Sequence, residues 1–351
     1  IPETSDLGSR FPLENAQDLD IGSNTVQAYS IFPENEYFSV SYGSHSEDDK
    51  YVELVLEKLL DREEQAEMSF SVIAEDGGSP PRTGTMEVKI VILDVNDNAP
   101  IFTQQVYIGK VLENMPEGSL VLSVLATDQD AGVNGDISYE LSQAVGQSDS
   151  TFVIDPRNGE IKITKPLDFE DSTHHVFRVK ATDGGGLSAI CKVQVEVVDV
   201  NDNAPELTVS SFSSPLPENT VPGTVVALFT VRDRDSGANG KISCALDDQL
   251  FFSLRPAYKN YYELLVLEKL LDREEQAEMS FSVIAEDGGS PPRTGTMEVK
   301  IVILDVNDNA PVFTQQVYIG KVLENMPEGS VVLSVLATDQ DAGVNGDISY
   351  E

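Results

Sequence analysis

The sequence has few of the residues on which common binding and catalytic sites depend. Tryptophan is absent, and the 351 residues include only two cysteines and three histidines. Basic residues are scarce, because 23 lysines and arginines stand against 60 acidic residues, and the formal net charge is −37. Binding to nucleic acid requires basic groups that neutralise phosphates, and anionic lipid attracts the same groups. The composition therefore excludes a nucleic-acid-binding protein and argues against docking on anionic lipid.

Long hydrophobic runs are missing as well. No apolar stretch approaches the roughly 20 residues of a membrane-spanning helix, and no signal peptide is visible. If the parent protein is secreted or anchored in a membrane, we expect this chain to be an internal piece of it. Membrane attachment would then use segments outside the sequence.

The few cysteines and histidines give no sign of catalysis. Cys191 and Cys244 lie in separate strand-like segments, so both are expected to be unpaired, half-buried thiols. His45 belongs to no Ser or Cys nucleophile motif. His174 and His175 are adjacent in a predicted strand and therefore point to opposite faces. We expect neither an enzyme nor a small-molecule substrate.

One pentapeptide is the clearest positive feature. Asn-Asp-Asn-Ala-Pro occurs at Asn96–Pro100, Asn201–Pro205 and Asn307–Pro311, about 105 residues apart. Each copy follows an apolar alternating run and an Asp-Val pair. A fixed period of this length indicates an array of domains. The oxygen-rich side chains in each copy point to a hard cation, most plausibly calcium.

Between these copies the dominant pattern has a period of two residues. Residues 85–92, 177–181 and 191–197 alternate apolar with polar side chains, which is typical of strands with one buried face. Turn residues separate the runs, and no long amphipathic helix is evident. The pattern predicts an all-β linear array of tandem seven-stranded, Greek-key, immunoglobulin-like sandwiches. The predicted domains are 1–100, 101–205 and 206–311, followed by a partial repeat at 312–351 that cannot close a sandwich.

A second repeat overlays the first. Leu54–Glu140 recurs as Leu265–Glu351, and the two copies differ only where Ile101 becomes Val312 and Leu120 becomes Val331. The third domain is therefore a hybrid, whose first half is its own and whose second half is copied from the first domain. A recent duplication, an assembly artefact and a deliberate chimera all remain open as its origin. The core of this domain must pack across a seam near residues 262–265.

Oxygen-bearing side chains recur in a fixed order in the repeats. An early glutamate comes first, followed by an Asp-x-Glu pair, the junction residues, an Asp-x-Asp pair with a later asparagine, and a late aspartate. A sandwich brings loops from distant strands to one end, so these donors are expected to meet at the boundary between two domains. The set at the second boundary is Glu113, Asp168, Glu170, Asp199, Asn201, Asp202, Asn203, Asp233, Asp235, Asn239 and Asp287.

The other boundaries carry corresponding sets. The first consists of Glu3, Asp61, Glu63, Asp94, Asn96, Asp97, Asn98, Asp128, Asp130, Asn134 and Asp183. The third consists of Glu218, Asp272, Glu274, Asp305, Asn307, Asp308, Asn309, Asp339, Asp341 and Asn345, and its late aspartate would fall beyond residue 351. Asp18, Asp20, Asn24 and Asp76 form the downstream half of a further set whose upstream half is not in the sequence.

Charge favours several divalent ions at each complete boundary. The second set holds eight carboxylates, which would repel one another strongly without cations. Three divalent ions would leave a local charge of about −2. Calcium takes six to eight oxygens in flexible geometry, including backbone carbonyls. Magnesium suits such shared carboxylates less well, and zinc would require Cys or His, which these motifs lack.

Two simpler interpretations fit less well. Asp, Asn, Gly and Pro are common turn residues, but five motifs in fixed order across three repeats are unlike ordinary turns. An EF-hand beginning at Asp128 fails, because Val133 and Tyr139 stand where that loop requires Gly and Glu.

These motifs resemble extracellular cadherin repeats. Leu-Asp-Arg-Glu, Asp-Val-Asn-Asp-Asn-Ala-Pro and Ala-Thr-Asp-Gln-Asp-Ala-Gly-Val-Asn-Gly are similar to that family's motifs, and the resemblance covers the whole chain. Gly8–Glu14, Tyr37–Val40, Leu187–Lys192 and Gly240–Cys244 are similar to stretches of the clustered protocadherins. The resemblance implies domains like repeats two, three and four, followed by the start of a further repeat. The first strand of the repeat-two-like domain is truncated.

The resemblance also implies a role for each donor. The early glutamate, the Asp-x-Glu pair and the junction aspartate would bind the upstream calcium ions. The Asp-x-Asp pair, the junction asparagines and the late aspartate would bind the downstream one. Backbone carbonyls would come from Val95, Val200, Val306, Asn98, Asn203, Asn309, Asn134, Asn239 and Asn345. Phe169 stands where the other domains have arginine, at a position that is not a ligand.

The implied function is calcium-dependent homophilic adhesion and recognition between cells. The partner would be another copy of the same or a closely related protocadherin, bound antiparallel in trans, with repeat two facing three and one facing four. Without repeat one, two copies of this chain could form only the two-facing-three part. The chain would be extracellular, within a single-pass plasma-membrane protein. The alternative is a calcium-stiffened tether or a heterophilic receptor without self-recognition.

Overall fold

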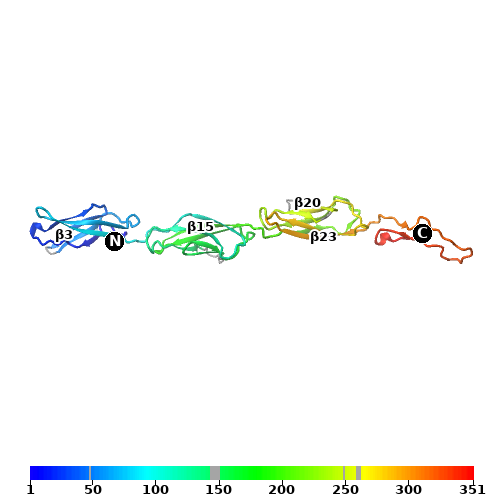
Figure 1. Cartoon of the computed structure of the whole chain (residues 1–351), viewed down its shortest axis with the longest axis horizontal. Helices are drawn as coiled ribbons and strands as arrows, with labels where there is room; N and C mark the ends of the chain where they lie inside the picture. Colours follow the sequence, from blue (N-terminus) through cyan, green and yellow to red (C-terminus); the bar gives the residue numbers. More distant parts are fainter. Residues whose placement is uncertain (47–48, 143–150, 248–249, 258–261) are drawn as a thin grey trace. The chain divides into compact units, whose positions relative to one another are not determined.

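Strands make up almost all of the regular structure in the computed structural model (Figure 1). The model describes residues 1–46, 49–142, 151–247, 250–257 and 262–351. In these residues the only helices are two short 3-10 turns, at Gly22–Asn24 and Gly343–Gly346. No helix in the described part of the chain has the length and apolar character needed to span a membrane. The predicted all-β fold is confirmed.

The chain divides into two compact units. One unit contains residues 1–168 and 172–197, and the other contains residues 169–171 and 198–351. The first unit holds two sandwiches, and the second holds one sandwich and the partial repeat.

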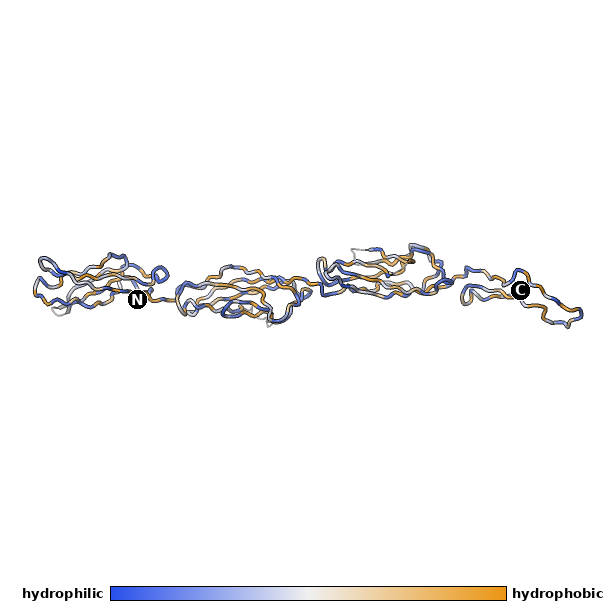
Figure 2. The backbone as a smooth tube through the Cα atoms, in the orientation of Figure 1, coloured by the Kyte–Doolittle hydropathy of each residue, from blue (hydrophilic) through white to orange (hydrophobic). Residues whose placement is uncertain are grey.

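Two three-stranded antiparallel sheets form the first sandwich, in the orders β1–β4–β3 and β2–β5–β6. Buried and exposed residues alternate along β5, where Met68, Phe70 and Val72 join Leu54 and Leu56 in the core. The same alternation of hydropathy follows the strands in Figure 2. The strands are β1 Arg10–Leu13, β2 Val26–Phe32, β3 Phe38–Ser46, β4 Asp49–Leu56, β5 Glu67–Asp76 and β6 Thr83–Val91.

The second sandwich has a four-stranded sheet, β11–β14–β15–β8, and a three-stranded sheet, β12–β13–β9. Val179, Cys191, Val193 and Val195 are almost fully buried in its core. Cys191 is a free thiol, but it is buried rather than half-buried, whereas Cys244 is half-buried as expected. The strands are β7 Ile101–Phe102, β8 Val106–Leu112, β9 Leu120–Ser123, β10 Ala126–Thr127, β11 Ser138–Ser142, β12 Phe152–Ile154, β13 Glu160–Ile163, β14 His174–Thr182 and β15 Ser188–Val198.

The third sandwich has two four-stranded sheets, β16–β18–β21–β20 and β17–β23–β22–β19. Its first strand is split between the two sheets, because β16 pairs antiparallel with β18 and β17 pairs parallel with β23. The strands are β16 Glu206–Phe212, β17 Leu216–Pro217, β18 Val225–Arg232, β19 Ser243–Leu246, β20 Phe252–Pro256, β21 Tyr262–Leu267, β22 Glu278–Glu286 and β23 Thr294–Leu304.

The seam of the hybrid domain lies within a single strand. The copied segment begins at Leu265 in β21, and this strand pairs with β18 and β20, which both belong to the domain's own half. Leu265 lies opposite Ala227 and Leu254, whereas the same leucine in the first sandwich, Leu54, lies opposite Phe11 and Val40. Leu265 is nevertheless 0 % exposed. The two halves therefore share one continuous core.

The partial repeat forms fewer strands than its sequence does elsewhere. Only β24 at Val312–Phe313 and β25 at Ala337–Thr338 form, as a short antiparallel pair. In the second sandwich the corresponding residues also form β8 and β9, which pair with β15 and β13. Residues 312–351 contain no counterpart of β13 or β15. The segments that correspond to β8 and β9 therefore have no strand with which to form hydrogen bonds. The same sequence is therefore a strand in one place and irregular in the other.

We expect residues at the seam of the third domain to contribute fully to the stability of its core. In the whole chain, Leu265→Ala should destabilise this domain by about 2–5 kcal/mol, as for other buried leucines. The amides of β18 and β20 should then exchange hydrogen faster in mass-spectrometric measurements. Leu270→Ala is the control, because that side chain is 69 % exposed. Equal exchange in the two variants would mean that the halves do not share a core.

Candidate metal centres

A buried glutamate anchors the first boundary. An isolated bridge between Pro2 and Leu93 brings the N-terminal residues beside the end of the sandwich, and Glu3 is only 5 % exposed there. Its two carboxylate oxygens accept hydrogen bonds from the backbone N–H groups of Arg62 at 2.8 Å and Val95 at 2.7 Å. These bonds hold the Glu3 side chain between the Asp-x-Glu loop and the linker.

Five predicted ligands, including this glutamate, form two adjoining groups. Oxygens of Glu3, Glu63 and Asp94 lie within 4.8 Å of one another, and so do oxygens of Glu63, Asp97 and Asp130. The two groups adjoin because Glu63 belongs to both. Asp130 comes from the second sandwich, so carboxylates from both sandwiches of this unit occupy one small region.

The linker is hydrogen-bonded to loops of the second sandwich. Asp94 accepts a bond from the backbone N–H of Ala131 at 2.8 Å and another from the Asn134 amide at 2.7 Å. Asn98 donates to Asp130 from its backbone N–H at 3.2 Å and from its side-chain amide at 2.8 Å. These contacts position the Asp-x-Asp loop against the junction residues.

The late aspartate approaches the linker from another loop. The Asn96 amide donates to Asp183 Oδ1 at 3.3 Å, and the same oxygen accepts backbone N–H bonds from Gly185, Gly186 and Leu187. A Cβ atom at Gly185 would collide with the Asn96 side chain. Glycine at this position therefore permits the close approach of the loop to the linker.

The same hydrogen bonds recur at all three boundaries. The junction asparagines Asn98, Asn203 and Asn309 donate their side-chain amides to Asp130, Asp235 and Asp341 at 2.7–2.8 Å. Asn134, Asn239 and Asn345 donate to Asp94, Asp199 and Asp305, again at 2.7–2.8 Å. Asp128, Asp233 and Asp339 accept the backbone N–H two residues ahead at 2.9–3.0 Å. The predicted motifs thus correspond to one repeated structural arrangement.

Unpaired oxygens show that this arrangement fits a hard cation. In the described part of the chain, eight buried side-chain nitrogen or oxygen atoms lack a hydrogen-bond partner. Buried polar atoms are normally paired, because an unpaired one costs roughly 1–3 kcal/mol. Seven of the eight are oxygens of predicted ligands, namely Asn96 Oδ1, Asp128 Oδ2, Asp183 Oδ2, Asn201 Oδ1, Asp233 Oδ2, Asp287 Oδ2 and Glu274 Oε1. Carboxylate and amide oxygens without hydrogens to accept are the donor set that calcium prefers.

The acids at the first boundary also titrate abnormally. Desolvation, followed by the charges of Glu3 and Asp130, raises the pKa of Asp97. Desolvation is likewise the main cause that raises the pKa of Glu63. Both carboxylates are thus held where their ionised form is disfavoured, and a bound cation would reverse that preference.

The second boundary falls between the two compact units. In the first unit, Glu113 is 2 % exposed. In the second unit, oxygens of Glu170, Asp199 and Asp235 lie within 4.8 Å of one another, and Asn201 donates to Asp287 Oδ1 at 3.1 Å. Desolvation raises the pKa of Asp233 on this side.

The third boundary repeats the first, although its last domain is partial. Oxygens of Glu218, Glu274 and Asp308 lie within 4.8 Å of one another. Desolvation, a hydrogen bond with Asp305 and the charge of Glu218 raise the pKa of Glu274 to about 7. Desolvation, followed by neighbouring carboxylates, also raises the pKa of Asp308.

Two predicted ligands use one oxygen within their own turn. Asp61 Oδ1 accepts the backbone N–H of Glu64, and Asp272 Oδ1 accepts that of Glu275, both at 3.0 Å. Each aspartate still lies near its cluster, since the charge of Asp61 acts on Asp97. The charge of Asp272 acts on Asp308 in the same way.

One residue in the first cluster was not predicted from the sequence. The Arg62 guanidinium lies among the carboxylates, with Nε 2.6 Å from Asp94 Oδ1. Desolvation alone would raise the pKa of Asp94, but its hydrogen bonds and this positive charge hold the pKa below its usual value. The Leu-Asp-Arg-Glu motif contains this arginine, but the motif gives no indication of which way the side chain points.

Comparison with known proteins identifies the family of this chain. A cadherin domain profile matches residues 1–93, 107–198 and 212–304. Human protocadherin beta-1 is 49 % identical over 350 residues, which is 100 % of this chain and 42 % of that protein. The crystal structure of the protocadherin GammaB4 extracellular domain aligns with a TM-score of 0.92 at 40 % identity, covering 99 % of this chain and 54 % of that one. Protocadherin Gamma B2 extracellular cadherin domains 1–5 align with a TM-score of 0.89 at 42 % identity, covering 99 % and 65 %.

The chain belongs to the cadherin family and is a clustered protocadherin. It spans less than half the length of the curated relative and 54–65 % of the two solved chains. Cadherin repeats generally bind calcium, and acidic clusters are present at the boundaries of this protocadherin.

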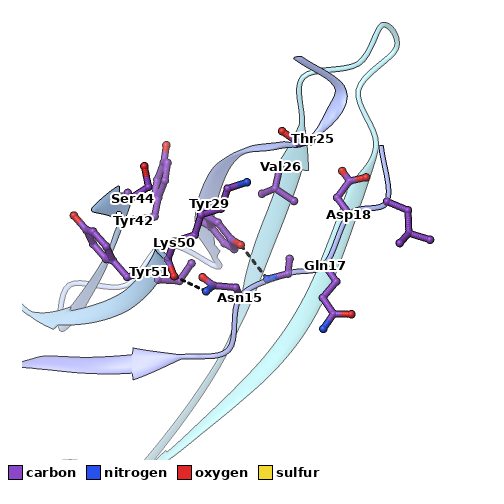
Figure 3. A pocket seen from close by; sticks show the side chains of 14 residues that line it. Asn15, Gln17, Asp18, Thr25, Val26, Tyr29, Tyr42, Ser44, Lys50 and Tyr51 are labelled. Carbon is purple, nitrogen blue, oxygen red and sulfur yellow. Dashed lines mark hydrogen bonds between the residues drawn. The ribbon is translucent and has the colours of Figure 1, made fainter. Parts of the chain in front are cut away.

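A cavity of about 500 Å³ lies elsewhere in the first cadherin repeat, among Tyr29, Tyr42 and Tyr51 (Figure 3). The Tyr29 hydroxyl accepts a hydrogen bond from the backbone N–H of Ala16 at 3.0 Å, and Asn15 donates to the Lys50 carbonyl at 2.6 Å. The first of these bonds has a direct counterpart in the second repeat of this protocadherin.

That counterpart explains the cavity. In the second repeat the Tyr139 hydroxyl accepts the Ala126 N–H at 2.9 Å, and the ring of Phe102 in β7 packs against Tyr139 with centroids 6.3 Å apart. In the described residues of the first repeat, no strand corresponds to β7. The cavity therefore lies where the second repeat has a strand, and we assign it no ligand.

The raised pKa of Asp97 leads to a prediction with two opposite signs. In chelator, Asp97→Asn should raise the melting temperature of the first repeat pair, because it removes one repelling charge. In calcium, the same variant should lower it, and the calcium affinity of this boundary should fall about tenfold, or ~1.4 kcal/mol.

Differential scanning calorimetry with and without calcium measures both effects. Asp6→Asn is the matched control, because Asp6 is exposed and lies outside the cluster. A variant that shifts the melting temperature in the same direction under both conditions would contradict the assignment of Asp97 as a calcium ligand.

Proposed function

We propose that this chain is a calcium-stiffened ectodomain segment that takes part in homophilic adhesion between cells. The observation that carries the proposal is the set of seven unpaired buried oxygens, all of them on predicted ligands. The match to protocadherin ectodomains over 99 % of the chain supports it.

In this proposal the ligands are the three residue sets predicted from the sequence, with about three calcium ions at each complete boundary. Calcium supplies the positive charge that the clustered carboxylates require. Backbone N–H groups hold Glu3 and Glu218 at the boundary, through bonds of 2.6–2.8 Å. Without the ion, the carboxylates gathered at each boundary repel one another; with it, adjacent repeats are held in a fixed relation.

The proposed domains are 1–100, 101–205, 206–311 and the partial repeat 312–351. Their proposed counterparts are repeats two, three and four of a clustered protocadherin, followed by the start of a further repeat. The solved relative that spans domains 1–5, protocadherin Gamma B2, supports this placement, because it contains repeats two to five.

The proposed partner is a second protocadherin of the same or closely similar sequence, bound antiparallel in trans. The first two repeats of this chain would provide the two-facing-three contact. The parent protein would be at the plasma membrane, with this chain outside the cell. The solved structure of one related fragment, protocadherin gammaB7 EC3-6, is a cis-dimer.

Sedimentation in calcium tests self-recognition. We expect a concentration-dependent dimer in calcium that dissociates in chelator, because recognition needs repeats held in register. Glu113→Ala should abolish the dimer, because Glu113 is a predicted calcium ligand of the second boundary and is 2 % exposed. Glu117→Ala is the matched control, because Glu117 is exposed and lies four residues further along the chain. A chain that stays monomeric at every concentration in calcium would favour the tether or heterophilic receptor instead.

A further inference from the structure

One guanidinium group links the two sandwiches of the first unit. Arg62 Nη2 lies 2.5 Å from Glu63 Oε1 and donates to the backbone carbonyl of Gln129 at 2.8 Å. Its Nε is 2.6 Å from Asp94 Oδ1. Glu63 belongs to the first sandwich, Asp94 to the linker and Gln129 to a loop of the second sandwich. The side chain is 18 % exposed, so these contacts are largely shielded from water.

The arginine uses atoms that a calcium ion would need. Glu63 and Asp94 are two members of the group whose oxygens lie within 4.8 Å of one another. A guanidinium bonded to both carboxylates leaves no room for a divalent ion on the same oxygens. Arginine and calcium are therefore alternative cations at this boundary.

We propose that Arg62 is a built-in counter-ion that holds the first boundary together when calcium is absent and leaves the carboxylates when calcium binds. The inference rests on the proposed assignment of these carboxylates as calcium ligands, but it does not depend on homophilic adhesion. It adds a resting state in which the first two repeats stay connected without metal.

At the third boundary the same residue lies farther from the carboxylates. Its sequence around Arg273 is identical, yet Arg273 Nη1 lies 3.9 Å from Glu274 Oε1 and the side chain is 30 % exposed. Glu274 and Asp305 are instead hydrogen-bonded to each other. An arginine in this motif thus has two positions, one within the carboxylate cluster and one beside it.

The corresponding motif at the second boundary has no arginine. Phe169 occupies the corresponding position, and its ring carries no charge and cannot donate hydrogen bonds to a carboxylate. The three boundaries should therefore respond differently to calcium removal. The second should loosen first as calcium falls, and the first should keep a residual connection.

The experiment measures the spread of distances across the first boundary in the full chain. Fluorophores are attached through unnatural amino acids at positions 87 and 138, which are exposed and lie in the first and second repeats. In chelator we expect a narrow distribution for the native sequence and a broad one for Arg62→Gln. Arg62→Lys should be intermediate, because lysine keeps the charge but cannot bridge three partners in one plane.

Calcium titration of the same labelled chains gives a second readout. Because the ion no longer displaces a bound cation, Arg62→Gln should reach half-saturation at a calcium concentration about fivefold lower, which corresponds to ~1 kcal/mol. Phe169→Arg, with labels at positions 138 and 298, should raise the calcium concentration for half-saturation of the second boundary by about the same factor. Arg273→Gln is the control and should change neither readout at the first boundary.

The outcomes separate this inference from the proposed function. If calcium narrows the distribution in all chains but Arg62→Gln matches the native sequence in chelator, the counter-ion role is wrong and the ligand assignment stands. If calcium narrows no distribution, the ligand assignment itself fails. If the native chain and Arg62→Gln both give narrow distance distributions in calcium, Arg62→Gln is folded. A broad distribution for Arg62→Gln in chelator then reports a change at the first boundary alone.

Discussion

Repulsion among crowded carboxylates is the constraint on which the rest of this structure depends. A formal charge of −37 spread evenly over the surface would matter little, but many of the acids lie close together where repeats meet. The first and third boundaries each bring three carboxylates within 4.8 Å of one another. Such a cluster persists only if hydrogen bonds, protons or cations offset its charge. The boundaries of this chain use all of these means.

The form of compensation differs between copies of one sequence. At the first boundary the Arg62 guanidinium bonds to Glu63 and Asp94. At the third boundary the pKa of Glu274 is raised to about 7, so this carboxyl keeps its proton at a higher pH than an ordinary glutamate. Both are substitutes for the ion that the unpaired oxygens of Asn96, Asn201 and their neighbours indicate. The buried polar atoms are therefore better explained as ligands than as turn residues.

Much of this could be predicted from the sequence, because the information is local. Alternating side chains such as those of β5 define strands directly, and the fixed order of Glu, Asp and Asn defines the ligand sets. Interactions between distant segments could not be predicted. Residues 317–323 repeat the sequence of β8, yet they form no strand, because the partner strand is missing. The position of the Arg62 side chain likewise depends on the opposing loop that offers the Gln129 carbonyl.

The hybrid third repeat shows how tolerant the sandwich is. Leu54 and Leu265 have identical downstream sequences and different cross-strand neighbours, yet both are almost fully buried. A hydrophobic residue of suitable size can pack against either set of partners. Ligand loops tolerate less, because each carboxylate must reach a defined point. This difference explains why the boundary motifs recur in every repeat while the rest of the sequence diverges between the second domain and its neighbours.

The central claim is that the boundary carboxylates hold calcium, and locating the ions tests it most directly. Anomalous scattering from crystals grown in calcium should give peaks beside Asn96 Oδ1, Asp128 Oδ2 and Asp183 Oδ2, and beside their counterparts at the second boundary. About three ions should lie at each of these two boundaries. Crystals grown in millimolar calcium with no anomalous peak at these oxygens would contradict the account.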